Sequence, residues 1–94
     1  MRTVNEILLA GSKIQKATKK GREVYFIFVP KDYWPHVRDK EWFVTVITKD
    51  REIPIGVRKP YRHANYLVIT LSVRLKKLWD PLVHEKVDVI LEQY

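Results

Sequence analysis

The sequence contains no cysteine, only three glycines and a single methionine. Without thiols, neither disulfides nor cysteine-ligated zinc can stabilise the chain, so packing, hydrogen bonds and ion pairs must do so. No apolar run approaches the ~20 residues that a membrane-spanning helix needs, and the first residues lack the apolar region of a signal peptide. We therefore expect a cytoplasmic protein with no membrane partner. The scarcity of Asn, Gln and Met beside many charged residues hints at a thermophilic source.

What is present is enough to fold. The chain has 94 residues, of which 46% are hydrophobic and 31% are charged. This length can bury one core but not two, so we expect residues 1–94 to form a single domain. The hydrophobic content is too high for a disordered basic tail.

The net charge of +7 is concentrated in two segments of the chain. Residues 1–22 hold six bases and one acid, and residues 58–77 hold six bases and no acid. The rest of the chain carries more acids than bases. Clustered Lys and Arg attract polyanions and displace counterions from phosphates, whereas evenly mixed charge mainly confers solubility. Either cluster alone would be read as a solvated surface, but the two together indicate a nucleic-acid partner.

The first half of the chain predicts a hairpin around a central strand. Residues 23–29 are apolar on both faces and rich in β-branched and aromatic side chains, which is typical of a buried strand. Residues 7–18 predict one preceding strand interrupted at Gly11. The turn between the two strands contains Gly21, which can adopt a positive φ, and the basic residues Lys19, Lys20 and Arg22.

A short helix and two strands are expected next. Pro30 suits a first helical turn, but Pro35 disfavours helical geometry at Trp34, so residues 30–37 should hold little more than one turn. Residues 42–47 predict a strand. After a polar turn, a short strand should place Ile53, Ile55 and Val57 on one face, and Pro54 suggests that it lies at a sheet edge.

The pattern then recurs. Residues 66–71 predict a strand, Ser72 is a candidate helix cap, and Asp80-Pro81 is expected to end the helix. The spacing of Leu75, Leu78 and Trp79 gathers them on an inner stripe, which leaves Arg74, Lys76 and Lys77 in solvent. Residues 86–91 predict a closing strand.

These elements suggest an internal repeat of residues 7–48 and 53–92. Residues 27–30 align with 69–72, and residues 44–47 align with 87–90, with a shift of one residue between them. We therefore expect an α+β fold: a β-rich, barrel-like domain of two ββαβ units with short helices. Residues 23–29 and 66–71 should occupy equivalent central positions about an approximate twofold axis, which could bring the two basic connections to one face.

Residues 13–58 resemble the swapped-hairpin DNA-binding domains of the AbrB family, within the cradle-loop barrels. The resemblance rests on Gly21-Arg22 leading into the central strand, on Val29-Pro30-Lys31 opening the helix, and on the strand that follows. Members of that family bind DNA as dimers through basic side chains of the hairpin loops. The resemblance implies that role here for Lys19, Lys20 and Arg22, and it implies a homodimer.

The sequence shows no enzyme signature. His36, His63 and His84 lack the spacing that would place two imidazoles on one metal, and the three glycines stand in separate turns rather than in a phosphate-binding loop. Ion pairs with neighbouring bases account better for Asp39 and Glu41 than acid–base chemistry does. We therefore expect no enzyme activity, metal, cofactor or small-molecule substrate.

The aromatic residues leave two interpretations open. Tyr25, Phe26, Phe28, Trp42 and Phe43 lie in predicted strands, where core packing is favoured over base stacking. Tyr61 lies among basic residues, where a nucleic-acid base could stack on it or it could simply cover the end of the barrel. Trp34 could form an exposed knob for a protein partner or a second subunit.

The sequence therefore favours a binding domain for duplex DNA that acts as a transcription regulator or chromatin-associated factor. Binding of RNA or single-stranded nucleic acid through Tyr61 is an alternative, and so is an adaptor whose basic face meets an acidic protein and whose anchor is Trp34. The expected nucleic-acid-binding residues are Lys13, Lys16, Lys19, Lys20, Arg22, Arg58, Lys59, Tyr61 and Arg62.

Overall fold

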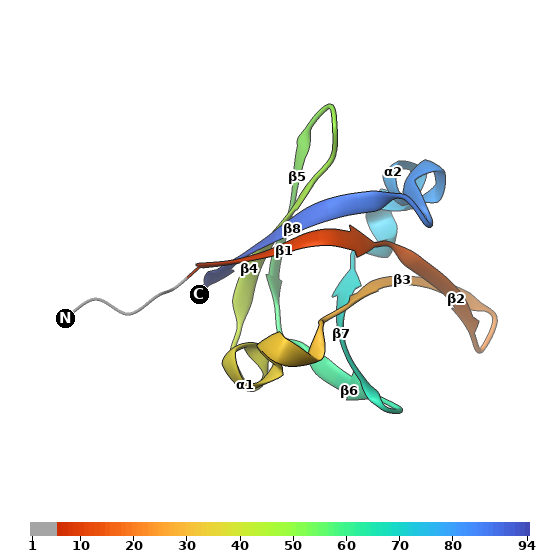
Figure 1. The fold of residues 1–94 in the computed structure, drawn as a ribbon. Helices are drawn as coiled ribbons and strands as arrows, with labels where there is room; N and C mark the ends of the chain where they lie inside the picture. Colours follow the sequence, from red (N-terminus) through yellow and green to blue (C-terminus); the bar gives the residue numbers. More distant parts are fainter. Residues whose placement is uncertain (1–5) are drawn as a thin grey trace.

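The computed structural model describes residues 6–94, which form two four-stranded antiparallel sheets (Figure 1). The strand order of the first sheet is β1 (Glu6–Lys13), β8 (Lys86–Gln93), β4 (Trp42–Ile47) and β5 (Glu52–Arg58). The order of the second sheet is β2 (Gln15–Lys19), β3 (Arg22–Phe28), β7 (Tyr66–Leu71) and β6 (Tyr61–His63). The expected strand-rich α+β fold is confirmed.

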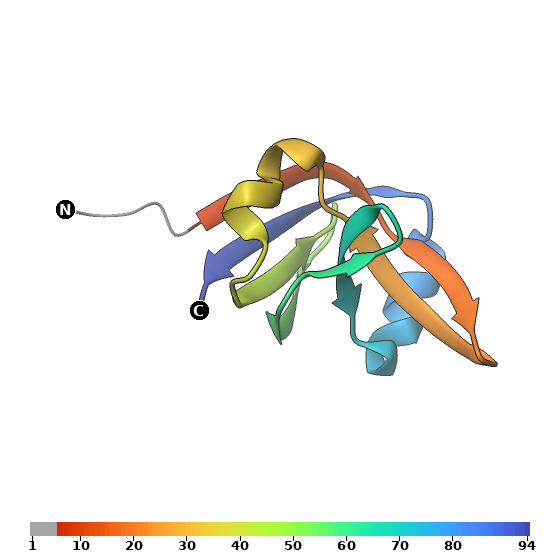
Figure 2. The same ribbon diagram turned by 90° about the horizontal axis from the view of Figure 1, so that it is seen from below.

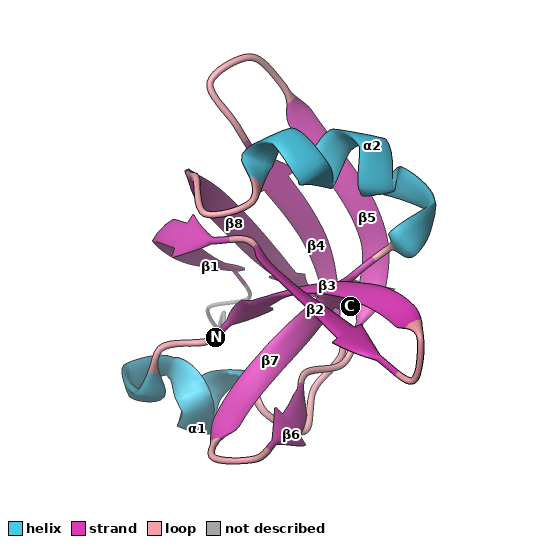
Figure 3. Cartoon of the chain, turned by 90° about the vertical axis from the view of Figure 1, so that its right-hand side faces the viewer, coloured by secondary structure: helices cyan, strands magenta, loops and turns pink. Residues whose placement is uncertain are grey.

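Two short helical segments connect the sheets. The chain between β3 and β4 forms a 3₁₀ turn, η1 (Lys31–Tyr33), followed by α1 (Trp34–Val37). The chain between β7 and β8 forms η2 (Val73–Leu75), α2 (Lys76–Trp79) and η3 (Asp80–Leu82). Figures 1 and 3 show α1 and α2 at opposite ends of the molecule, and Figure 2 shows the β2–β3 hairpin projecting from one side.

The core is built by alternation along the inner strands of both sheets. Tyr25 and Ile27 of β3 and Val44 and Val46 of β4 are almost completely buried, and they belong to one hydrophobic cluster. Side chains two positions apart on a strand point to the same side, so each inner strand presents one apolar face to this cluster. Trp79 of α2 is also fully buried.

The second helical segment has the predicted stripe. Leu75 and Leu78 pack against the core beside Trp79. The basic residues between them are exposed: Arg74, Lys76 and Lys77. This prediction is confirmed, because three- and four-residue spacing gathers the apolar side chains on the inner side of the segment.

Strand pairing is symmetric about one residue pair in each sheet. Ile27 lies directly opposite Ile69, and Val46 lies directly opposite Val89, which are the residues that the sequence alignment of the two halves equates. β3 and β7 are the inner strands of one sheet, and β8 and β4 are the inner strands of the other. β1 and β5 both carry a one-residue bulge. This is the register that two related halves packed about a twofold axis would produce.

The turn between β2 and β3 has the expected conformation. Lys20 has a φ of 51° and Gly21 a φ of 79°, so both residues of the two-residue turn are left-handed. That geometry matches the twist of the flanking strands, and glycine adopts it without a steric penalty. The basic hairpin tip is therefore a true β-turn at the end of β2 and β3.

Four backbone expectations were wrong. Trp34 takes helical angles of −52° and −47° despite Pro35, which itself lies in the first turn of α1, where its missing N–H breaks no helical hydrogen bond. The helical segment does not end at Asp80-Pro81 but continues as a 3₁₀ turn to Leu82. The Ser72 side chain makes no capping hydrogen bond. Gly11 forms the bulge of β1 rather than a break, and the strand is interrupted at Ile14.

The expected side-chain faces were also wrong at four positions. In β5 the bulge moves Val57 to the side opposite Ile53, because Val57 pairs with the exposed Phe43 whereas Ile53 pairs with the buried Val46. Phe28 and Phe43 are 38% and 36% exposed, and the half-buried Phe26 lies on the same outer side of β3 as Phe28, so none of the three packs in the core as expected. The sheet faces that point away from the core are therefore not purely polar.

Candidate nucleic-acid interface

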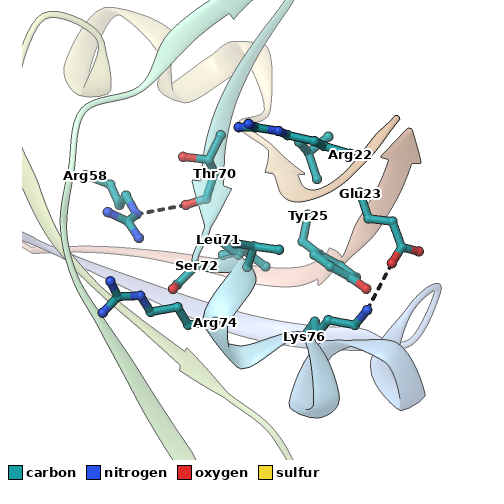
Figure 4. A pocket seen from close by; sticks show the side chains of 11 residues that line it. Arg22, Glu23, Tyr25, Arg58, Thr70, Leu71, Ser72, Arg74 and Lys76 are labelled. Carbon is teal, nitrogen blue, oxygen red and sulfur yellow. Dashed lines mark hydrogen bonds and ion pairs between the residues drawn. The ribbon is translucent and has the colours of Figure 1, made fainter. Parts of the chain in front are cut away.

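A groove lies beside the first residues of β3, beyond the point at which β7 stops pairing with that strand. β7 pairs with β3 only from Leu71, opposite Tyr25, to Val68, opposite Phe28. The chain then turns at Ser72 into the helical segment, so the first residues of β3 form one wall of the groove and η2 forms another (Figure 4). The groove has a volume of about 770 Å³. It is lined by Arg22, Glu23, Val24, Tyr25, Arg58, Thr70, Leu71, Ser72, Val73, Arg74 and Lys76.

Three arginines from separate segments line this groove (Figure 4). Arg22 comes from the hairpin, Arg58 from the end of β5, and Arg74 from η2. The half-buried Arg58 donates from Nε to the Thr70 carbonyl oxygen at 3.2 Å, which fixes its side chain against β7. In the part of the chain that the structure describes, the recorded ion pairs include none of these guanidinium groups. Their positive charges therefore remain available to an anion.

A network of ion pairs, which includes the groove-lining Glu23, Tyr25 and Lys76, neutralises Lys16 and Lys76. The Lys16 ammonium lies 2.7 Å from a Glu23 carboxylate oxygen and 3.1 Å from an Asp80 oxygen. Lys76 lies 3.2 Å from Glu23, and the Tyr25 hydroxyl donates to Asp80. These contacts join β2 and β3 to the second helical segment.

The network shifts the pKa values of its members. Hydrogen bonds from Lys16 and then Lys76 lower the pKa of Glu23, and hydrogen bonds from Tyr25 and then Lys16 lower the pKa of Asp80. The same contacts, with Glu23 first, raise the pKa of Lys16. Opposite charges stabilise each other's ionised forms. Lys16 is already paired with Glu23 and Asp80, so it does not belong to the candidate interface.

A second depression lies on the outer face of the β2-β3-β7-β6 sheet. It has a volume of about 280 Å³ and brings together Lys19 and Tyr61, one residue from each basic segment. The other residues that line it are Ala17, Thr18, Val24, Phe26, His63 and Val68. Val24 also lines the arginine groove, so the two depressions are adjacent along β3.

Arg62 lines neither of these two depressions and contacts the ring of Trp34 instead. The Arg62 guanidinium carbon lies 5.3 Å from the centroid of the Trp34 ring, within the range of a cation–π contact. The Trp34 indole donates from Nε1 to the Val29 carbonyl oxygen, and the half-buried ring packs against the core. Trp34 is therefore partly engaged within the chain rather than fully exposed as a knob.

The remaining predicted residues lie outside both depressions. Lys13 is at the end of β1, opposite Lys86. Lys20 occupies the hairpin turn, and Lys59 lies in the exposed connection between β5 and β6. The structure thus joins Arg22 with Arg58, and Lys19 with Tyr61, but it does not bring all nine predicted residues to one place.

Sequence reasoning missed Arg74 as a site residue. Arg74 belongs to the acid-free segment 58–77, which could have indicated it, but its helical spacing shows only that it faces solvent. Its approach to Arg22 and Arg58 depends on where β7 ends. Sequence reasoning also missed the exposed face that Phe28 and Tyr66 share, because a strand that is apolar on both sides is expected to be buried on both.

Two other features, a metal site and a membrane-spanning helix, are absent from the described residues. Within residues 6–94, no group of three or more His, Asp and Glu side chains could hold a metal ion. Over the same residues, no helix has the length and apolar character needed to cross a membrane.

Comparison with known proteins gave no match to a protein family, a curated protein or a solved structure.

Proposed function

We propose that this protein binds nucleic acid through the phosphate backbone and that the groove of Arg22, Arg58 and Arg74 is its principal contact. The observation on which the proposal rests is the meeting of three arginines, from three segments, in one groove whose carboxylate, Glu23, is paired with lysines rather than with them. Like charges gathered in one place repel each other, and an anion bound between them would relieve that repulsion.

The chemistry of the groove suits phosphate. Arginine offers a planar fork of donors that matches a phosphate group, and it remains charged at any physiological pH. Arg58 is held by its bond to Thr70, so little side-chain freedom is lost when it binds. Release of counterions from the nucleic acid would add to the affinity. Duplex DNA and single strands both present such phosphates, so the groove by itself would serve either.

The AbrB-like features give the proposal a second support. In that family the bases of the hairpin loop contact DNA, and here Arg22 belongs both to the hairpin and to the groove. A homodimer, as in that family, would double the number of phosphate contacts. A role in transcription regulation or chromatin would follow if duplex DNA proved to be the preferred ligand.

We also propose that the chain consists of two related ββαβ units that close into a barrel-like fold. The symmetric registers about Ile27–Ile69 and Val46–Val89 support this, as do the matching bulges of β1 and β5. In this arrangement β2 and β6 are equivalent edge strands. The two basic segments would then be counterparts in the two units.

The test is a binding titration with Arg22→Gln/Arg74→Gln, because both side chains are exposed and their replacement should leave the fold intact. Lys49→Gln/Arg51→Gln, in the exposed turn between β4 and β5, is the matched control with the same change in charge. We expect the groove variant to bind more weakly, and its log–log salt slope to be smaller by about two units, while the control binds nearly as the parent does. Equal effects of the two variants would show that net charge, and not the groove, attracts the ligand.

A further inference from the structure

The outer face of the second sheet is aromatic. Along β3, Tyr25 and Ile27 point into the core, so the alternate residues Phe26 and Phe28 point outward. Phe28 lies opposite Val68 of β7, and Val68 lies opposite Tyr61 of β6. Because directly opposite residues in antiparallel strands share a face, the outward rings of the inner and edge strands lie on one surface. We call Phe26, Phe28, Tyr61, His63 and Tyr66 the aromatic face.

The rings of the aromatic face contact one another and remain open to solvent. The ring centroids of Phe26 and Phe28 are 5.4 Å apart, and those of Phe28 and Tyr66 are 4.8 Å apart. Tyr61 and His63 form a further pair at 6.4 Å. Phe28 is 38% exposed, Tyr61 44% and Tyr66 52%, whereas Val68 between them is only 1% exposed. The face is therefore a platform of supported rings over a filled interior.

The charge around the platform is positive. Lys19 and Arg22 pair with each other across β2 and β3 and lie on the same side of the sheet as Phe26. The described residues of β2, β3, β7 and β6 that point to this side include no carboxylate. Arg22, Val24 and Thr70 lie on this side and also line the arginine groove. The platform and the phosphate-binding groove are therefore continuous.

We infer that the aromatic face stacks the unpaired bases of a single-stranded nucleic acid whose phosphates occupy the arginine groove. This inference rests on the proposed function and names the class of its ligand. Exposed rings beside cations suit single strands, because every base has a face that can stack and the backbone remains free to follow the basic residues. In a duplex the bases already stack on one another, so the platform would have nothing to bind. A protein ligand would need acidic side chains to match the basic border as well as an apolar surface to cover the rings.

The decisive experiment compares a single strand, an abasic strand and a duplex of the same length by fluorescence anisotropy. The abasic strand keeps the sugars and phosphates but lacks bases. The test variant is Tyr61→Ala/Tyr66→Ala, which removes two exposed rings. Tyr61→Phe/Tyr66→Phe keeps the rings, and Tyr33→Ala/Tyr94→Ala is the matched control at two exposed tyrosines outside the platform.

We expect the parent to prefer the single strand to both other ligands. The alanine pair should bind the single strand about tenfold more weakly or worse, since base stacking contributes substantially for each base. Its affinity for the abasic strand should be unchanged, and the phenylalanine pair and the control should bind as the parent does. Circular dichroism of each variant separates loss of binding from loss of the fold.

Other outcomes overturn this inference in distinguishable ways. If the parent binds duplex and single strand equally and the alanine pair has no effect, while Arg22→Gln/Arg74→Gln weakens binding, the aromatic face is not a base platform and the phosphate groove stands. If the alanine pair leaves binding unchanged but changes the molecular mass of the protein measured by sedimentation, the aromatic face is a contact between subunits. If the parent binds none of the three ligands, the proposed function fails as well.

Discussion

The Lys16 ammonium on β2 lies 2.7 Å from the Glu23 carboxylate on β3, and it also reaches Asp80, 64 residues further along the chain. One lysine thus connects the projecting hairpin to the end of the second helical segment. Because these side chains are between one third and one half exposed, solvent weakens the pairing without removing its pH dependence.

The first prediction concerns acid. The folded-state pKa values of Glu23 and Asp80 are lowered, so their contribution to stability is present above the ordinary carboxyl pKa of about 4 and is lost as the pH falls through the lowered values. Lys16→Met should be less stable than the parent at pH 7, and the difference should shrink as the pH drops below 4. Thermal unfolding across this range measures it. A difference that stayed constant would contradict the pairing.

The second prediction concerns the core. Trp79 is fully buried, and its indole donates to the Ser72 carbonyl oxygen at 2.8 Å. Trp79→Ala should therefore lower the free energy of unfolding by about 3–5 kcal/mol, because it leaves a large cavity. Urea denaturation measures this, with the exposed Lys77→Ala as the control expected to change little. A loss below about 1 kcal/mol would mean that the helical segment is not part of the cooperative core.

The third prediction separates charge from geometry in the groove. Arg58→Lys keeps the positive charge but loses the bond from Nε to Thr70 and the planar donor fork. Binding should weaken severalfold, while the salt slope should stay near that of the parent. Isothermal titration at several salt concentrations reports both quantities. Full retention of affinity would show that Arg58 acts only as a point charge.

The fourth prediction concerns the hairpin. Replacing Lys19, Lys20 and Arg22 together with Gln should weaken binding similarly across sequences, with a loss of roughly one unit of log–log slope for each phosphate contact removed. The fold should survive, since exposed charges usually contribute within about 0.5 kcal/mol each. A folded triple variant that binds as the parent does would reduce the hairpin to a solvated turn and would also exclude Arg22 from the phosphate contacts.

Local structure was largely predictable from the sequence, but the sides of the strands were not. β3 could be recognised from its run of apolar and β-branched residues, and Trp79 from its helical spacing. The same run does not reveal that Phe28 points outward, because apolar residues on both faces of a strand suggest that both faces are buried. In β5 the bulge near Gly56 turned Val57 away from Ile53, and alternation alone does not reveal an extra residue.

The sequence predicts which segments supply the residues of the candidate site, but not how those residues are arranged. Charge segregation identified the segments that supply Arg22, Arg58 and Arg74, but their meeting depends on β7 being shorter than β3. No pattern of neighbouring residues separates Lys16 from the other bases. Its partners Glu23 and Asp80 come from distant segments, which only the tertiary fold brings together.

The salt dependence of binding by the parent protein tests the central claim most directly. If three arginines hold phosphates, the logarithm of the binding constant should fall linearly with the logarithm of salt concentration, with a slope of about −2 to −3. Arg22→Gln/Arg74→Gln should flatten that slope, and Lys49→Gln/Arg51→Gln should not. A slope near zero for the parent, or the absence of binding at low salt, would contradict a phosphate-binding groove.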